Sequence, residues 1–412
     1  MDSLLLNTNL INKLLNLVNY PKDIPVVYDK YLHFFPLLIL GFLAALLLTP
    51  VIGLIAKKLK IYDYPSQERK DLLNKFDDPN RHLHKEKIPK LGGLAVIVPL
   101  VIALILFLKP SAEVTTIIIS LSLLTIVGIL DDVFNLPAII QLIAQILAAT
   151  IIAFSVINFS SITNPLGGSI NLSMFTWNFK FLGLPGSFAF PGDLFIIPWI
   201  ILCINALKWT AGSDGVMESN SIIAFALLFV LGIRNESGII AVTTIVTSGA
   251  LIGFLVYNFP PAKIFSGATT KTVLGFLIAT LALVNGAKIP TTIIILALPI
   301  VDAIFVLIYR VVTQKPKNII DLLRINGTVH LHHQLMKIGV GAKGILLIEA
   351  TFTLLFGLLA VLTTGAFKLL ALFAVASIIL IGISVAHILS AKKQAEERKK
   401  QSEQSPESKY SY

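Results

Sequence analysis

The chain has 412 residues, of which 55% are hydrophobic and only 14% are charged. Soluble domains carry about 25% charged residues, so most of this surface does not face water. The composition therefore excludes a soluble enzyme, a small secreted disulfide scaffold and a disordered protein. Cys203 is the one cysteine of the sequence, which excludes an intramolecular disulfide and a cysteine-cluster metal site.

Long apolar runs recur along the sequence, and each is near the ~20 residues that one membrane-spanning helix needs. The runs are 34–56, 92–108, 114–130, 137–158, 193–208, 219–233, 238–257, 270–284, 290–312, 344–362 and 367–389. A membrane β-barrel would show short segments of alternating polarity instead. We therefore predict an all-α polytopic membrane protein with about 11 transmembrane helices.

The sequence divides into three parts around these runs. Residues 34–390 form the predicted transmembrane domain, and 1–33 form a predicted N-terminal interfacial segment. Residues 391–412 are rich in Lys, Glu, Gln and Ser, so we expect a disordered, basic cytoplasmic tail. Within the domain, 158–192 is the longest outer connection, and its Asn-Pro, Gly-Gly and Leu-Pro-Gly sequences predict a short hairpin region on the outer surface.

Basic residues indicate the orientation in the membrane. The segment 57–90 alone holds ten Lys or Arg, and such residues accumulate in cytoplasmic loops. Alternating spans from this loop place the C-terminus in the cytoplasm and the N-terminus outside, with the protein in the plasma membrane. The formal net charge of +10 is explained by this bias, so no nucleic-acid partner is expected.

Polar side chains near these apolar runs are costly in hydrocarbon, so their positions are informative. Nearly all of them lie near the predicted cytoplasmic side, and they come from four separate loops. They are Asp131, Asp132, Asn205, Lys208, Asp214, Asn258, Lys263, Lys271, Asp302, Arg310, His330, His332 and His333. This arrangement is typical of a membrane-embedded site that opens toward the cytoplasm.

The residue types in this set favour phosphate chemistry. Adjacent carboxylates hold Mg²⁺ or accept a proton, and Mg²⁺ commonly bridges carboxylates to substrate phosphates. Lysine, arginine and histidine neutralise phosphate oxygens. Phosphoryl transfer mainly requires positioning and charge stabilisation, and a membrane location implies that one substrate is a lipid.

Simpler structural explanations are open for each motif. Asp131 and Asp132 suit the start of the helix that follows them, and Asp214 suits an ordinary turn. The histidine-rich segment 330–333 would also fit a solvated loop, and Asp302 would fit a buried pair with a neighbouring helix. A transporter would instead carry ionisable residues along a path through the middle of the membrane, whereas here they gather near one face.

Five motifs occur in order along residues 35–390. They are His84-Lys-Glu-Lys-Ile-Pro-Lys-Leu-Gly-Gly93, Gly128-Ile-Leu-Asp-Asp-Val-Phe-Asn-Leu136, Asn205-Ala-Leu-Lys-Trp-Thr-Ala-Gly-Ser-Asp-Gly215, Tyr257-Asn-Phe-Pro-Pro-Ala-Lys-Ile-Phe265 and His330-Leu-His-His333. The ordered set resembles the polyprenyl-phosphate N-acetylhexosamine-1-phosphate transferase superfamily, or glycosyltransferase family 4. That superfamily includes the phospho-N-acetylmuramoyl-pentapeptide transferases and the UDP-GlcNAc:undecaprenyl-phosphate GlcNAc-1-phosphate transferases.

The resemblance implies a reaction. A UDP-sugar gives its sugar-1-phosphate, GlcNAc-1-phosphate or similar, to undecaprenyl or another polyprenyl phosphate, and UMP is released. This step initiates a lipid-linked glycan of the cell envelope, such as peptidoglycan. The resemblance also implies Mg²⁺ as cofactor and a cytoplasmic active-site cleft, and it allows for a homodimer. The 330–333 and 257–263 sequences slightly favour the GlcNAc branch over the muramoyl-pentapeptide branch.

The resemblance also implies roles for individual residues. The implied catalytic residues are Asp131, Asp132, His332 and His333. The implied substrate-binding residues are His84, Asn205, Lys208, Asp214, Lys271 and His330. Asp132 and Asp214 are the candidate metal ligands.

The sequence departs from the family pattern around the implied metal site. Ala268 stands where the family carries a metal-binding aspartate, and Lys208 where it carries a second asparagine. Gln141 stands where it carries a lysine, and Ala211 where it carries the first aspartate of the Asp-Gly loop. Two hypotheses follow. Either Lys208, with Lys271, replaces part of the cation environment in an active transferase, or the chain is a non-catalytic scaffold that binds polyprenyl phosphate or a UDP-sugar.

Overall fold

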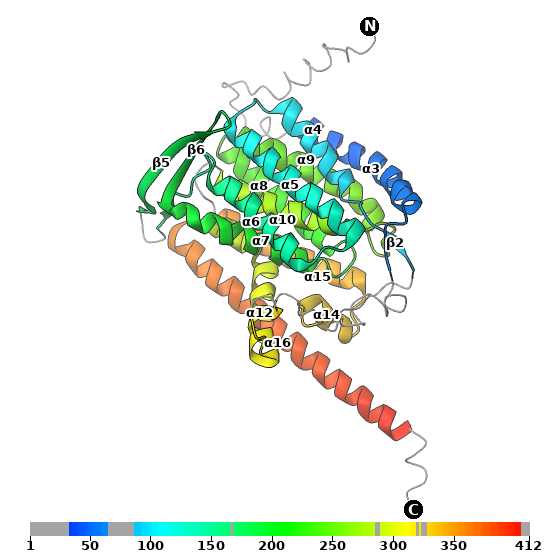
Figure 1. Cartoon of the computed structure of the whole chain (residues 1–412). Helices are drawn as coiled ribbons and strands as arrows, with labels where there is room; N and C mark the ends of the chain where they lie inside the picture. The colour runs from blue at the N-terminus through cyan, green and yellow to red at the C-terminus, as the bar shows by residue number, and fades with distance from the viewer. Residues whose placement is uncertain are drawn as a thin grey trace, which may run out of the picture.

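The computed structural model describes residues 33–64, 86–164, 168–284, 289–318, 321–322 and 328–404. The predicted N-terminal segment, apart from its last residue, and the candidate residue His84 lie outside these ranges. Within them, the chain is a bundle of α-helices with short two-stranded hairpins attached (Figure 1).

The described helices follow one another along the chain. They are α3 (Phe35–Lys58), α4 (Leu94–Phe107), α5 (Ala112–Phe134), α6 (Ala138–Ala153), α7 (Ile196–Thr210), α8 (Val216–Arg234), α9 (Gly238–Asn258), α10 (Gly267–Leu283), α11 (Ile289–Ile295), α12 (Ala297–Gln314), α14 (Leu331–Lys337), α15 (Ala342–Leu362) and α16 (Gly365–Gln404). A 3₁₀ turn, η2 (Gly192–Phe195), leads into α7.

The apolar runs of the sequence all coincide with described helices, and the run 290–312 is shared by α11 and α12. Eight spans among the described residues are long and apolar enough to cross a membrane, and α4, α6 and α10 are shorter apolar helices. The all-α polytopic membrane class is therefore confirmed. The number of spans and their orientation stay predictions.

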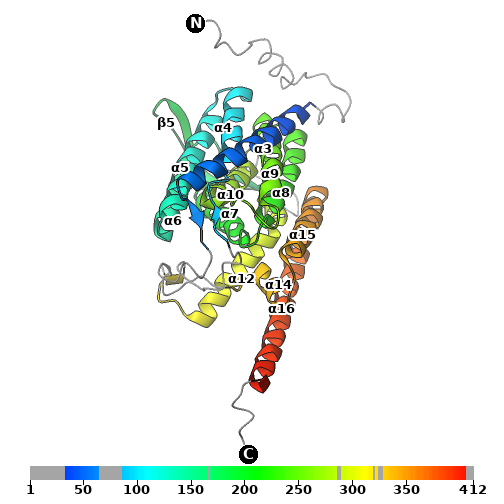
Figure 2. The ribbon, with the colours of Figure 1, turned by 90° about the vertical axis from the view of Figure 1, so that its right-hand side faces the viewer.

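Helix α10 lies inside the bundle, where it packs against α5 and α7. Almost every residue from Gly267 to Leu283 is buried. On the side of the bundle seen in Figure 2, α3 packs closely along α9, because a Cβ on Gly41 would lie only 2.4 Å from the carbonyl oxygen of Val246. Small residues allow membrane helices to approach in this way. Polar groups at the start of α10 are therefore enclosed by neighbouring helices.

The 158–192 connection forms two antiparallel hairpins, as the sequence predicts. Strand β3 (Ser161–Thr163) pairs with β4 (Ser169–Asn171), and β5 (Ser173–Phe181) pairs with β6 (Leu184–Pro191). The buried carboxylate of Asp193 accepts hydrogen bonds from the backbone N–H groups of Phe159 and Ala189, both at 2.6 Å. This carboxylate fixes the base of the hairpins to the start of α7.

Helix α16 runs far beyond the bundle, as Figure 1 shows, and ends at Gln404. Residues 391–404 are therefore helical where we expected a disordered tail. The physical reason is composition: Lys, Gln, Ala and Glu are strong helix formers, and Glu396 lies four residues before Lys400 in the favourable order for an ion pair. Residues 405–412 lie outside the described ranges.

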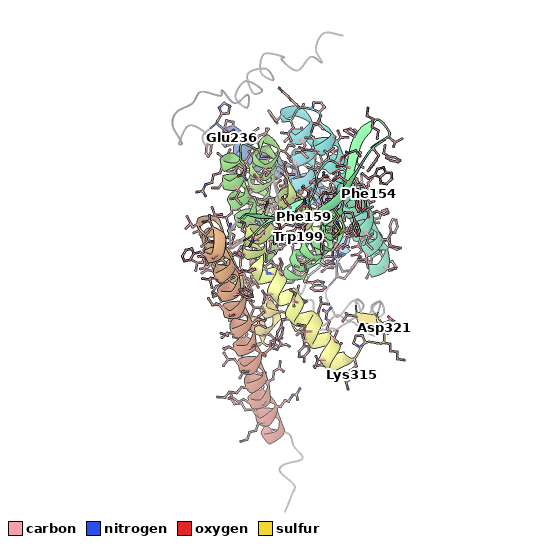
Figure 3. The ribbon with its side chains drawn as sticks, turned by 90° about the vertical axis from the view of Figure 1, so that its left-hand side faces the viewer. Phe154, Phe159, Trp199, Glu236, Lys315 and Asp321 are labelled. Carbon is pink, nitrogen blue, oxygen red and sulfur yellow. The ribbon has the colours of Figure 1, made fainter. Side chains whose placement is uncertain are left out.

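Two connections lie at opposite ends of the bundle. Glu236, in the turn between α8 and α9, lies at one end, and Lys315 and Asp321, which follow α12, lie toward the other (Figure 3). The predicted topology requires this placement. We call the second of these ends the Lys315 end.

Candidate active site

The first-loop motif docks onto the segment that precedes α10. Strand β1 (Tyr62–Asp63) pairs with β2 (Ile88–Pro89), and the Pro89 carbonyl accepts from the Phe265 N–H at 2.9 Å. The N–H groups of Gly92 and Gly93 donate to the carbonyl oxygens of Phe265 and Ser266 at 2.9 and 3.0 Å. Both glycines pack too closely for a side chain. The two motifs therefore form one backbone-bonded unit beside the ends of α5 and α10.

Asp132, at the end of α5, is turned onto the start of α10. Its Oδ1 accepts from the backbone N–H of Ala268 at 2.7 Å, and its Oδ2 accepts from the N–H and hydroxyl of Thr269 at 3.3 and 2.8 Å. The residue is only 4% exposed. Gly267 has φ +77°, and a Cβ there would lie 2.3 Å from the Asp132 carboxylate. Asp132 therefore caps a helix N-terminus, which favours negative charge, but that helix is α10 and not the α6 that follows it in sequence.

Asp131 faces a different neighbour, because consecutive residues on a helix point about 100° apart. Its Oδ1 accepts from the side-chain N–H of Gln141 on α6 at 2.9 Å. The other end of that amide, Gln141 Oε1, accepts from the Lys208 ammonium at the end of α7. One turn away, Asn205 donates to Gln145 at 2.7 Å. Polar side chains thus connect α5, α6 and α7 in a continuous chain.

Two lysines supply positive charge to the paired carboxylates. Lys208 and Lys90 are the oppositely charged neighbours of Asp131, and Lys90 is also a charged neighbour of Asp132. Lys90 comes from the first-loop motif, and its ammonium also lies 3.7 Å from Asp63 Oδ1. We call Asp131, Asp132, Gln141, Lys208 and Lys90 the aspartate cluster.

A small cavity lies beside this cluster. Asp131, Gln141 and Thr272 contribute to its lining, and its volume is about 10 Å³. That volume is about enough for a single water molecule.

The Asp-Gly loop is fixed to the segment after α9. Asp214 Oδ2 accepts from the Ala262 N–H at 3.0 Å, and Asn258 accepts from the Gly215 N–H at 3.0 Å. One turn into α8, the buried Glu218 accepts a hydrogen bond from the Ser266 side chain and has Lys271 and Asp214 as charged neighbours. Glu218 was not predicted from the sequence, although a carboxylate directly before the apolar run 219–233, four residues after Asp214, was a usable signal.

The histidine motif forms a second cluster. His330 Nδ1 lies 2.6 Å from Asp302 Oδ2, and Asp302 Oδ1 accepts from the Leu331 N–H at 2.9 Å. The rings of His330 and His332 stack with centroids 5.7 Å apart, and those of His332 and His333 are 4.2 Å apart. All three histidines are at most 5% exposed. A solvated loop is therefore excluded, and the partner of Asp302 is the histidine segment itself.

The end of α7 joins the two clusters. The ring of Trp209, next to Lys208, lies 5.6 Å from His330, and the Arg310 guanidinium lies over the same ring at 5.4 Å. Just beyond α7, Gly212 is so close that a Cβ would lie 2.1 Å from His332 Nε2. We call Asp302, His330, His332, His333, Trp209 and Arg310 the histidine cluster.

The implied Mg²⁺ site does not fit these residues. Among the described ranges, no group of three or more His, Cys, Asp or Glu side chains is arranged to hold a metal ion. The two candidate ligands are bonded to different backbone segments, Asp132 to the start of α10 and Asp214 to Ala262. We therefore assign no step to an ion.

Comparison with known proteins agrees with these motifs. The sequence model described as "Glycosyl transferase family 4" matches residues 114–286. A phospho-N-acetylmuramoyl-pentapeptide-transferase of Clostridium beijerinckii is 31% identical over 255 residues, which are 60% of this chain and 72% of the relative. The chain belongs to glycosyl transferase family 4.

The family match runs from the first turn of α5 to just beyond α10, so it contains the paired aspartates, Lys208 and the Asp-Gly loop. A probable undecaprenyl-phosphate N-acetylglucosaminyl 1-phosphate transferase of Bacillus subtilis is 28% identical over 342 residues, 81% of this chain and 86% of the relative. This longer similarity involves most of the transmembrane domain. The superfamily expected from the five motifs is confirmed.

Proposed function

We propose that this family 4 protein transfers a sugar-1-phosphate, GlcNAc-1-phosphate or a similar one, from a UDP-sugar to undecaprenyl or another polyprenyl phosphate and releases UMP. The reaction initiates a lipid-linked glycan of the cell envelope. The observation that carries the proposal is the aspartate cluster, in which a half-buried carboxylate has two ammonium groups as neighbours at the ends of apolar helices. The names of the family relatives support the same reaction class.

The residues of the aspartate cluster suit this transfer. An oxygen of the lipid phosphate attacks the phosphorus that carries the sugar, a new P–O bond forms, and the bond from that phosphorus to the UMP oxygen breaks. UMP leaves with the electrons of the broken bond. We assign to Asp131 the acceptance of the proton carried by the lipid phosphate, because Gln141 holds one of its oxygens in place. Asp132 positions the start of α10.

Other predicted residues take binding roles in the proposal. His332 and His333 neutralise phosphate charge beside the end of α7, and His330 is oriented for this by Asp302. The donor is bound at the Asp-Gly loop, where Asp214 and Lys271 share Glu218 as a neighbour. Asn205 supports the α6–α7 contact through Gln145. For His84, outside the described ranges, we propose the substrate-binding role that the resemblance implies.

The proposed location is the plasma membrane, with the site and the C-terminus in the cytoplasm, the N-terminus outside and a homodimer as the assembly. The Lys- and Arg-rich segment 57–90 supports this orientation, because it leads directly into the first-loop motif of the site. UDP-sugars are water-soluble and charged, so the polar side chains must face the compartment that supplies them.

The proposal is tested by UMP release from the purified full chain. Undecaprenyl phosphate is supplied with a panel of UDP-sugars, UDP-GlcNAc first. We expect UMP only when both the lipid and a suitable donor are present. Donor binding without UMP release across the whole panel would contradict the proposal and favour the non-catalytic scaffold.

A further inference from the structure

We propose that the paired-aspartate site takes its positive charge from Lys208 and Lys90 and holds no divalent ion. The inference rests on the proposed function for its chemical meaning, because the charge would neutralise a pyrophosphate. The binding claim stands separately on the geometry of the aspartate cluster.

Asp132 already accepts three hydrogen bonds. Both of its oxygens bind groups at the start of α10, within 3.3 Å. One of those groups is the backbone N–H of Ala268, the residue at the position of the family's aspartate. This position therefore contributes a donor and a methyl group where a metal site needs an oxygen ligand. A metal at Asp132 would compete with the hydrogen bonds that cap a buried helix.

Space at Asp131 is also too small for a hydrated ion. Mg²⁺ needs about six oxygen ligands at ~2.0–2.1 Å and usually keeps several waters. The cavity that Asp131 shares with Gln141 and Thr272 has a volume of about 10 Å³. One water fits there, and a hydrated Mg²⁺ does not.

Lysines supply charge of opposite sign to the paired aspartates without an ion. Lys208 and Lys90 are those neighbours, and Lys90 also pairs with Asp63. Lys208 reaches Asp131 through Gln141, whose amide accepts from the ammonium and donates to the carboxylate. A dication added beside two ammonium groups would be repelled.

The Gln141–Lys208 contact also places the ammonium relative to the family pattern. Gln141 stands at a position where the family carries a lysine, and Lys208 stands where it carries an asparagine. The two side chains are bonded here, so the resemblance implies that the amide and the ammonium have exchanged helices within one contact. The positive charge of the cluster is therefore built into α7.

The test combines Mn²⁺ binding with UMP release. The chelator-treated, purified full chain is titrated with Mn²⁺ and followed by electron paramagnetic resonance, which needs no activity. We expect no bound Mn²⁺ in the wild type and none in Lys109→Met, a matched lysine change beyond the opposite end of α5. The double variant Lys208→Asn with Ala268→Asp, which removes an ammonium and adds a carboxylate, should gain a Mn²⁺ site.

UMP release measures how much the Lys208 ammonium contributes to the reaction. Wild-type release should be unchanged by EDTA, and Lys208→Gln should lower it about 100-fold, the usual effect of removing one charge-stabilising donor. Adding Gln141→Lys to Lys208→Gln returns an ammonium to the same place and should restore release without Mg²⁺. Thermal unfolding of each variant separates these effects from misfolding.

Two results would overturn the inference. One is stoichiometric Mn²⁺ binding by the wild type that Asp131→Asn abolishes, and the other is loss of UMP release in EDTA with recovery in Mg²⁺. If no donor gives UMP under any condition, the proposed function fails. The Mn²⁺ titration still decides whether the site holds an ion.

Discussion

The aspartate cluster and the histidine cluster share one feature, a buried aspartate bonded to the start of a helix, and they differ in the groups around that aspartate. In each, one buried aspartate accepts from the backbone at the start of a helix: Asp132 from Ala268 and Thr269, and Asp302 from Leu331. Asp302 has the carboxylate of Glu349 as a charged neighbour, and its histidine partner lies among aromatic rings, whereas Asp132 has the carboxylate of Asp131 and the ammonium of Lys90 as neighbours.

This difference distinguishes carboxylates that hold a helix in place from a carboxylate that can react. A carboxylate bonded to backbone N–H groups holds an element in place and is costly to disturb. Asp131 is bonded instead to the side chain of Gln141, which in turn contacts Lys208. Side chains rearrange more easily than a helix start, so Asp131 is the carboxylate that is suited to take a proton.

The largest effect is expected for Asp131→Asn. UMP release should fall by about 10² to 10⁴-fold, the usual contribution of a positioned acid or base. Stability should be preserved, because the amide oxygen still accepts from Gln141. The matched control is Glu113→Gln, the same change in the first turn of α5, which should leave release unchanged. Equal losses of UMP release in the two variants would show that Asp131 does not act in the chemical step.

A smaller effect is expected for Asp302→Asn. The amide has one acceptor oxygen where the carboxylate has two, so His330 and the Leu331 N–H can no longer each donate to an oxygen of their own. We expect KM for the UDP-sugar to rise about tenfold, equivalent to ~1.4 kcal/mol, with less change in kcat. Asp321→Asn, at the Lys315 end, is the control. A fall in kcat alone would show that the histidine cluster acts in the chemical step and not in binding.

The smallest effect is expected for a pair of glycine changes. Gly267 and Gly183 have φ +77° and +82°, so alanine strains both by about 1–2 kcal/mol. Only at Gly267 would the added Cβ meet Asp132; at Gly183 nothing lies within 4 Å. Gly267→Ala should therefore lose clearly more unfolding free energy than Gly183→Ala. Similar losses would mean that the contact between Asp132 and α10 is loose.

Hydropathy predicted the helices well because each buries a long apolar stretch, which is a local property. The break in the run 290–312 was missed, since residues 289–295 and 297–314 are equally apolar and only their packing separates α11 from α12. The helix in the C-terminal tail was not predicted for a related reason. Low hydropathy excludes a core position, but residues 391–404 still have high helix propensity.

For the site, sequence motifs identified most of the residues and not their partners. Neighbouring aspartates look equivalent in sequence, but about 100° of helix rotation sends Asp131 to α6 and Asp132 to α10. Contacts across more than 100 residues, such as Asp132 with Thr269, depend on how helices pack. Lys90 belongs to the first-loop motif, 84–93. Its proximity to the aspartates depends on the contact between this motif and the segment before α10.

The division between the two aspartates is tested most directly by unfolding Asp131→Asn and Asp132→Asn side by side, without substrate. We predict a melting temperature several degrees lower for Asp132→Asn, because an uncharged amide weakens the cap of α10, and a nearly unchanged value for Asp131→Asn. The reverse order, or equal losses, would contradict the assignment of Asp132 as the anchor and Asp131 as the reacting carboxylate.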